Sequence, residues 1–176
     1  PRVKRIESAI RTDEDIFPRM GEILTTMCAD VPDRFACIAQ QRSAWAQIQA
    51  DARDAYDKCH FTSFVGFEWS DQAMANNEAT NHRNVIFGSS RVPAAPLSSV
   101  RYTDPPKLWN ALESQCTGDC RAVTIPHNTN LSGGVSLRVW NWAPRSVRLQ
   151  KKYQVSAEIY QHKGASECLY DPATGY

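Results

Sequence analysis

The strongest constraint on the fold is a strand–helix–strand pattern in the middle of the chain. Apolar runs at residues 83–88 and 121–125 have the length and composition of buried strands. Between them, residues 106–113 begin with proline and place large apolar side chains on one face, which predicts a helix. Strands joined through a crossover helix usually pair in parallel, so we expect a βαβ unit within an α/β sheet or barrel.

Further elements are predicted on either side of this unit. Residues 1–58 are expected to be helical, with an early helix over 16–26, and residues 61–69 and 155–161 are expected to be strands. One apolar stripe in the helical part is expected to face the core: Trp45, Ile48, Ala52, Ala55 and Tyr56. No internal repeat is present, so residues 1–176 are predicted to form one domain, with a helical segment (1–58) and a strand-rich site segment (59–176). The chain begins at Pro1 and not at Met, which leads us to expect an incomplete domain.

Charge and hydropathy exclude some classes of function. Twenty basic residues against nineteen acidic ones leave a net charge of +1, and the basic cluster at residues 145–152 is short, so a nucleic-acid partner is not favoured. No stretch approaches the roughly 18–20 apolar residues that a membrane span requires. We therefore expect neither a nucleic-acid partner nor a membrane span.

The six cysteines indicate the cellular compartment, because disulfides form in oxidising environments. Cys116 and Cys120 bracket a Thr-Gly-Asp turn, and Cys28 and Cys37 bracket a loop, so we predict two local disulfides and a periplasmic or secreted protein. A zinc site at residues 116–120 is less favoured, because no second ligand pair has similar spacing. The remaining two are expected to be buried free thiols or a third pair: Cys59 and Cys168.

Residues 124–134 form the segment most typical of a functional site. A short strand, ended by Pro126, delivers His127, Asn128 and Asn130 into a glycine-ended loop. Glutamate and histidine also stand at the ends or beginnings of the other predicted strands, at Glu68, His82, Glu158 and His162. Carboxylate and imidazole are ligands for Zn²⁺, Mn²⁺ or Fe²⁺, so these positions predict a metal site. The alternative is a set of histidines with ordinary hydrogen bonds.

Several segments, in order, resemble the DUF3604 family, a branch similar to the PHP (polymerase and histidinol phosphatase) metal-dependent hydrolases. The segments that carry the resemblance are residues 61–70, 81–87, 108–109, 124–134 and 158–168. Compact signatures of other enzyme classes are missing, among them His-Glu-x-x-His, Gly-x-Ser-x-Gly and the phosphate-binding Gly-x-x-x-x-Gly-Lys.

The resemblance implies part of a distorted PHP-type β/α barrel with an N-terminal helical segment, whose strand ends hold divalent metals for hydrolysis, commonly of phosphate esters. By motif, Glu68, His82 and His127 would be metal ligands. The candidate catalytic residues are Arg83 and Lys163, and one or the other would contact an anionic group of a small substrate. The remaining pocket residues implied by the family pattern are Asn128, Asn130, Glu158, Gln161 and Glu167.

The chain departs from the family pattern at both ends of the expected site. It contains neither the opening His-x-His motif nor the closing Asp-x-His motif. We therefore expect an internal segment of a hydrolase whose site needs other segments of the same parent protein. The alternative is a non-catalytic, disulfide-stapled secreted or periplasmic binding module, which would use Trp140 and Trp142 to contact a partner.

Overall fold

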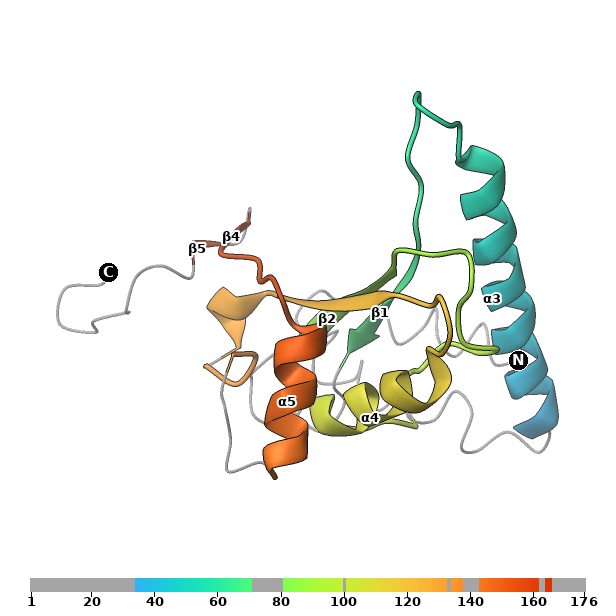
Figure 1. Ribbon diagram of the computed structural model, residues 1–176. Coiled ribbons are helices and arrows are strands. Elements are labelled where there is room, and N and C mark those ends of the chain that lie inside the picture. Colours follow the sequence, from blue (N-terminus) through green and yellow to red (C-terminus); the bar gives the residue numbers. More distant parts are fainter. Residues whose placement is uncertain are drawn as a thin grey trace, which may run out of the picture.

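The computed structural model describes residues 34–70, 81–99, 101–132, 134–137, 143–161 and 164–165. Helices and strands follow one another as a mixed α/β arrangement (Figure 1). The elements are α3 (Arg34–Ala55), β1 (Val65–Ser70), β2 (His82–Phe87), α4 (Pro105–Gln115), β3 (Ala122–His127), the 3₁₀ helix η3 (Thr129–Leu131), α5 (Pro144–Tyr153), β4 (Tyr160–Gln161) and β5 (Gly164–Ala165). None of the helices in these ranges is long and apolar enough to cross a membrane.

The three longest strands form one antiparallel sheet in the order β1-β2-β3. The predicted parallel pairing is therefore wrong. The chain leaves β2 at Phe87 and enters β3 at its register partner Ala122, so the connection starts and ends at the same end of the sheet. The residues before α4 first run back along the sheet, where the carbonyl of Tyr102 accepts a hydrogen bond from Trp69 Nε1 (2.9 Å) at the far end of β1. The helix then returns the chain to its starting end.

One face of the sheet builds the core. Val65, Trp69, Val85 and Phe87 are buried there, together with the apolar side of α4 and α5. Helix α3 contacts the sheet through β1, and its Trp45 ring lies edge-on to Phe67 and Phe87 at centroid distances of 5.7 and 6.0 Å. In Figure 1, α4 and α5 lie together on one side of the sheet and α3 stands at its end.

Helix α4 confirms the sequence prediction for residues 106–113. Asp104 caps its N-terminus by accepting a hydrogen bond from the backbone N–H of Lys107 (2.8 Å), and two prolines follow the cap. Leu108, Trp109 and Leu112 are fully buried, and Trp109 Nε1 donates to Thr124 Oγ1 on β3 (3.0 Å). This bond fixes the helix against the sheet.

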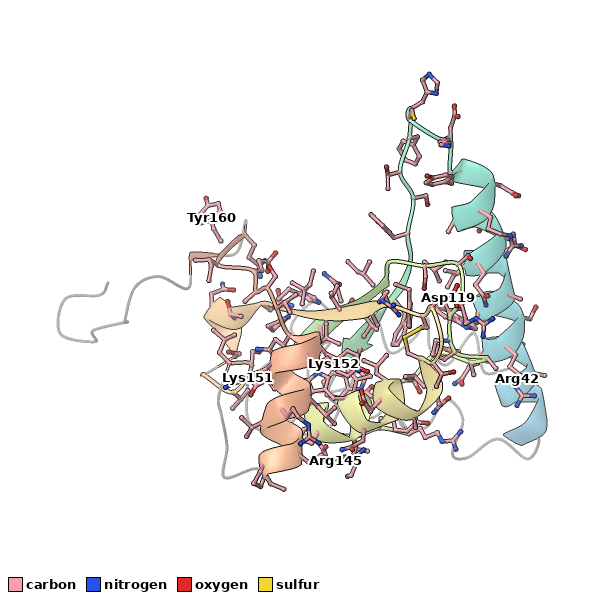
Figure 2. All side chains as sticks on the ribbon, in the orientation of Figure 1. Arg42, Asp119, Arg145, Lys151, Lys152 and Tyr160 are labelled. Carbon is pink, nitrogen blue, oxygen red and sulfur yellow. A yellow bond between two sulfur atoms is a disulfide. The ribbon has the colours of Figure 1, made fainter. Side chains whose placement is uncertain are left out.

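Helix α5 was not predicted from the sequence. Its charged side chains, including Arg145, Lys151 and Lys152 in Figure 2, are exposed, and only Leu149 and Tyr153 bring large apolar surface into the core. The strand predicted at residues 155–161 is reduced to β4, because residues 155–159 have no regular structure.

The predicted stripe of α3 is only partly in the core. Trp45 is buried and Ala52 packs against the core, but Ile48 and Tyr56 are 39% and 53% exposed and Ala55 is also exposed. Only one side of α3, with Trp45 and Ala52, packs against the core, so the rest of the predicted stripe stays outside it. The predicted helix at 16–26 lies outside the described residues.

The disulfide between Cys116 and Cys120 is confirmed, with an S–S distance of 2.04 Å and a Cα–Cα distance of 5.1 Å. It closes the turn between α4 and β3. Cys59 is a free thiol and is exposed, so its predicted burial or pairing is wrong. Several positions with predicted roles have no described side chains: Cys28, Cys37, Trp140, Trp142, His162, Lys163, Glu167 and Cys168.

Candidate metal centre

Three predicted ligands come together at one end of the sheet. His82 and His127 are register partners on β2 and β3, and Glu68 lies two residues before Ser70, the partner of His82 on β1. Because strand side chains alternate between faces, all three side chains project from the face opposite to Trp69 and the core.

The carboxylate of Glu68 lies between the two imidazoles. Its Oε1 is 2.8 Å from His82 Nδ1 and 3.6 Å from His127 Nε2, and the ligand atoms of the three residues all lie within 4.8 Å of one another. The side chain of Glu68 is 48% exposed, that of His82 30% and that of His127 17%. The cluster is therefore open to solvent through Glu68 and closed at His127.

The donor set fits a divalent ion. His127 Nε2 is buried and has no hydrogen-bond partner among the described residues, since Glu68 Oε1 is too distant for one. Two ligands of a common transition-metal ion, each at about 2.0–2.2 Å from it, lie at most about 4.4 Å apart. The separations of 2.8 and 3.6 Å from Glu68 Oε1 to the two histidine nitrogens fall within this limit, so the three residues could hold one ion.

The backbone turns sharply directly after His127. Asn128 adopts the left-handed conformation (φ 58°, ψ 31°) and caps the short helix η3. Asparagine tolerates this region better than most residues, which explains its place there. Ser132 Oγ then donates to the carbonyl of Thr129 (2.9 Å) inside the turn.

The predicted pocket residues on the C-terminal segment lie against this turn. Gln161 Nε2 donates to Asn128 Oδ1 (2.5 Å) and to Asn130 Oδ1 (3.2 Å). Glu158 bonds to the same turn through its carboxylate and its backbone. The structure thus brings together four of the residues that the sequence predicted for the pocket: Asn128, Asn130, Glu158 and Gln161.

Arg83 is not part of the cluster. It follows His82 on β2, so its side chain enters the opposite face, where it is fully buried. Its guanidinium donates to Gln154 Oε1 (2.5 Å), Asn81 Oδ1 (3.2 Å) and the carbonyl of Ser136 (2.9 Å), and stacks 5.5 Å from the ring centroid of Trp109. The predicted contact of Arg83 with a substrate at the cluster does not fit this placement, and strand alternation could have excluded it from the sequence.

Ser70 was missed by the sequence prediction. Its hydroxyl donates to Glu68 Oε1 (3.0 Å), which makes it the neighbour that fixes the carboxylate. The sequence contains the information needed to predict this contact. Ser70 is two residues after Glu68, so the two side chains share one face of the strand.

A cavity of about 630 Å³ lies at the other end of the sheet, next to Val65, Phe87 and the last turn of α3. Its lining is largely apolar, with Tyr56 and Phe64 among the residues, and includes no histidine, cysteine or carboxylate. Volume alone would favour this cavity as a ligand site. We place the candidate chemistry at the cluster because that is where ligating groups converge.

Comparison with known proteins identifies a family. The profile of the family described as "Protein of unknown function (DUF3604)" matches residues 11–172. No curated protein and no solved structure matches the chain. Since the match spans most of the chain and includes the segments with Glu68, His82 and His127, the protein belongs to the DUF3604 family.

Proposed function

We propose that the chain carries the metal-binding centre of a metal-dependent hydrolase of the PHP-like type, acting on phosphate esters. The observation that supports this best is the cluster of Glu68, His82 and His127, in which the buried His127 Nε2 is left without a hydrogen bond among the described residues. On this proposal, the antiparallel sheet is part of a larger, distorted β/α barrel.

The three side chains would have different tasks. His127, the most buried of the three, would supply the fixed ligand, and Glu68 would supply negative charge between the imidazoles. Ser70 would hold the Glu68 carboxylate by its hydrogen bond. A bound divalent cation would supply Lewis-acid activation of water and of the ester.

Access to the centre suits a substrate that arrives from solvent. Glu68 and His82 are partly exposed on the face of the sheet that α4 and α5 leave open. Arg83 cannot contact an anion there, because it is buried on the opposite face. Of the two cationic residues predicted for the substrate, Lys163 is the one that this proposal retains.

The second candidate is a non-catalytic, secreted or periplasmic binding module. It is favoured by the contacts of Glu68 Oε1, which accepts a hydrogen bond from Ser70 Oγ and lies 2.8 Å from His82 Nδ1, so that this oxygen has partners without an ion. The Cys116–Cys120 disulfide suits an oxidising compartment under both proposals.

Metal titration distinguishes the metal-dependent hydrolase from the binding module. Protein stripped with a chelator is titrated with Zn²⁺ and Mn²⁺ by calorimetry, and the bound ion is counted by elemental analysis. We expect one ion per chain for the wild type and a loss of at least about tenfold in affinity for His127→Ala. The matched control is His60→Ala, because His60 is 79% exposed in the turn between α3 and β1.

Hydrolysis is then measured with p-nitrophenyl phosphate at saturating metal. Metal-dependent release of phosphate that is lost in His127→Ala supports the hydrolase. Metal binding that is equal in wild type and His127→Ala, or no metal binding at all, contradicts the proposed centre. Stoichiometric metal without hydrolysis of p-nitrophenyl phosphate supports the metal centre and contradicts phosphate esters as its substrates.

A further inference from the structure

We infer that Glu158 is a positioning residue for His127, acting through the backbone on both sides of that histidine. The inference rests on the proposed function, since it concerns the same centre. It assigns Glu158 to the support of a ligand, in place of the substrate contact that the family pattern implies.

Glu158 makes hydrogen bonds to three residues that flank His127. Its backbone N–H donates to the carbonyl of Pro126 (3.0 Å), and its Oε2 accepts from the backbone N–H of Asn128 (3.0 Å). Its carbonyl accepts from Thr129 Oγ1 (2.8 Å). One residue, distant in sequence, therefore holds the chain immediately before and immediately after the predicted ligand.

The position of His127 in the sheet makes this support necessary. β3 is an edge strand of the three-stranded sheet, and β2 is its only neighbour in the part of the chain that the structure describes. Along its other edge, Pro126 has no N–H to offer, and its carbonyl is satisfied by Glu158. The backbone at residue 158 thus holds β3 on its outer side, and the Glu158 carboxylate adds the contact that follows His127.

The turn after His127 is also held by hydrogen bonds from the segment that contains Glu158. Asn128 is in the left-handed region, a conformation that costs roughly 1–2 kcal/mol for most residues. Its N–H is bound by the Glu158 carboxylate and its side-chain oxygen by Gln161. A charged acceptor on a backbone N–H is among the stronger hydrogen bonds, so Glu158 is well suited to hold this conformation.

Glu158 does not itself belong to the cluster of ligand atoms. The described groups that lie within ligating distance of one another are Glu68, His82 and His127. The effect of Glu158 on a bound ion must therefore pass through the orientation of His127, which is how outer-shell residues tune metal sites.

The test compares metal affinity and coordination in four proteins: wild type, Glu158→Ala, Glu158→Gln and Glu113→Ala. We expect Glu158→Ala to weaken Zn²⁺ binding by about 10–100-fold, the usual effect of removing an outer-shell partner. Glu158→Gln should retain most of the affinity, because its amide oxygen can still accept from Asn128. Glu113→Ala is the matched control, since Glu113 joins α4 to α5 through Lys152 and Tyr153, away from the centre.

The visible absorption spectrum of the Co²⁺-substituted protein reports the ligand geometry directly. A changed spectrum in Glu158→Ala, with the wild-type spectrum in Glu113→Ala, supports positioning over a general loss of stability. If wild type binds no ion, the proposed function fails. If wild type binds and Glu158→Ala keeps the same affinity and spectrum, only the positioning role is overturned.

Thr129→Val is the second variant, for use if Glu158→Ala does not fold. It removes one bond to Glu158 at nearly constant side-chain volume. Weaker Zn²⁺ binding with an unchanged circular dichroism spectrum supports the inference, and wild-type affinity overturns it.

Discussion

His82 and His127 stand directly opposite each other on β2 and β3, with ring centroids 5.7 Å apart and planes inclined at 71°. The rings do not stack face to face, and each presents a nitrogen to the same oxygen, Glu68 Oε1. Cross-strand register therefore builds the candidate metal centre from residues that are far apart in the sequence.

Removal of His82 tests whether the cluster binds an ion as one unit. We expect His82→Ala to lower Zn²⁺ affinity by at least about tenfold, measured by calorimetry on chelator-stripped protein. Asn84→Ala is the control, because Asn84 is exposed two residues along the same face and belongs to no ligand cluster. Equal affinities in the two variants would show that His82 is not a ligand.

Arg83→Met is expected to destabilise the fold strongly. It leaves the buried oxygens of Asn81 and Ser136 and the partly buried oxygen of Gln154 without the guanidinium, at a cost of about 3 kcal/mol in the free energy of unfolding. Arg91→Met, which breaks an exposed pair with Asp119, should cost less than about 1 kcal/mol. Urea denaturation followed by tryptophan fluorescence measures both, and similar midpoints would contradict a structural role for Arg83.

Gly66 is expected to tolerate no side chain. A Cβ at this position would lie 2.9 Å from the backbone oxygen of Val85 on the neighbouring strand, so Gly66→Ala should cost about 1–3 kcal/mol through strand displacement. At Gly88 the nearest atom to a Cβ would be 3.8 Å away, and Gly88→Ala should change stability by at most about 0.5 kcal/mol. Thermal unfolding of the two variants gives the comparison, and the prediction fails if Gly66→Ala melts at the wild-type temperature.

Loss of the Cys116–Cys120 disulfide should lower stability by about 2 kcal/mol, the value that chain entropy predicts for so short a loop. The double variant Cys116→Ser/Cys120→Ser is compared with Cys59→Ser, which removes an exposed free thiol. Denaturant midpoints without reductant report the difference. Identical midpoints would mean that the disulfide adds no stability to the folded chain.

The ion pair between α4 and α5 should make stability depend on pH. The hydrogen bond from Lys152 and then that from Tyr153 hold the pKa of Glu113 below its ordinary value of 4.5. Because the folded pKa is lower than the unfolded one, the stabilisation is fully present above pH 4.5 and is lost as the pH falls through the folded value.

The partner of Glu113, Lys152, makes stability depend on pH at the alkaline end of the range. Its hydrogen bond to Glu113 raises the pKa of Lys152 above 10.5, so that this contribution is present below pH 10.5 and is lost as the pH rises through the folded value. Glu113→Gln should reduce stability at neutral pH by about 0.5–1 kcal/mol and flatten the acid limb. Melting temperatures from pH 3 to pH 7 test this, and an unchanged acid limb would contradict it.

Much of the local structure could be predicted from the sequence. Asp104 and the following prolines define the start of α4, whose apolar face is buried as expected, and the turn at residues 116–120 is short enough for a local disulfide. Glu68, His82 and His127 were identified by motif and by residue type, both of which are properties of the sequence. The local sequence is therefore sufficient to predict the ligand types of the candidate centre and the elements that carry them.

The pairing of strands and the faces of their side chains were decided by the tertiary structure. Residues 88–99 and 101–104 are followed by a helix that returns the chain to the end of the sheet where β2 ended, so β2 and β3 are antiparallel. No local propensity encodes the direction of such an irregular segment. The same packing buries Arg83 against Trp109, leaves most of the α3 stripe in solvent and brings Glu158 beside His127. These outcomes depend on contacts between distant segments, whose free energies are determined only when the whole chain is packed.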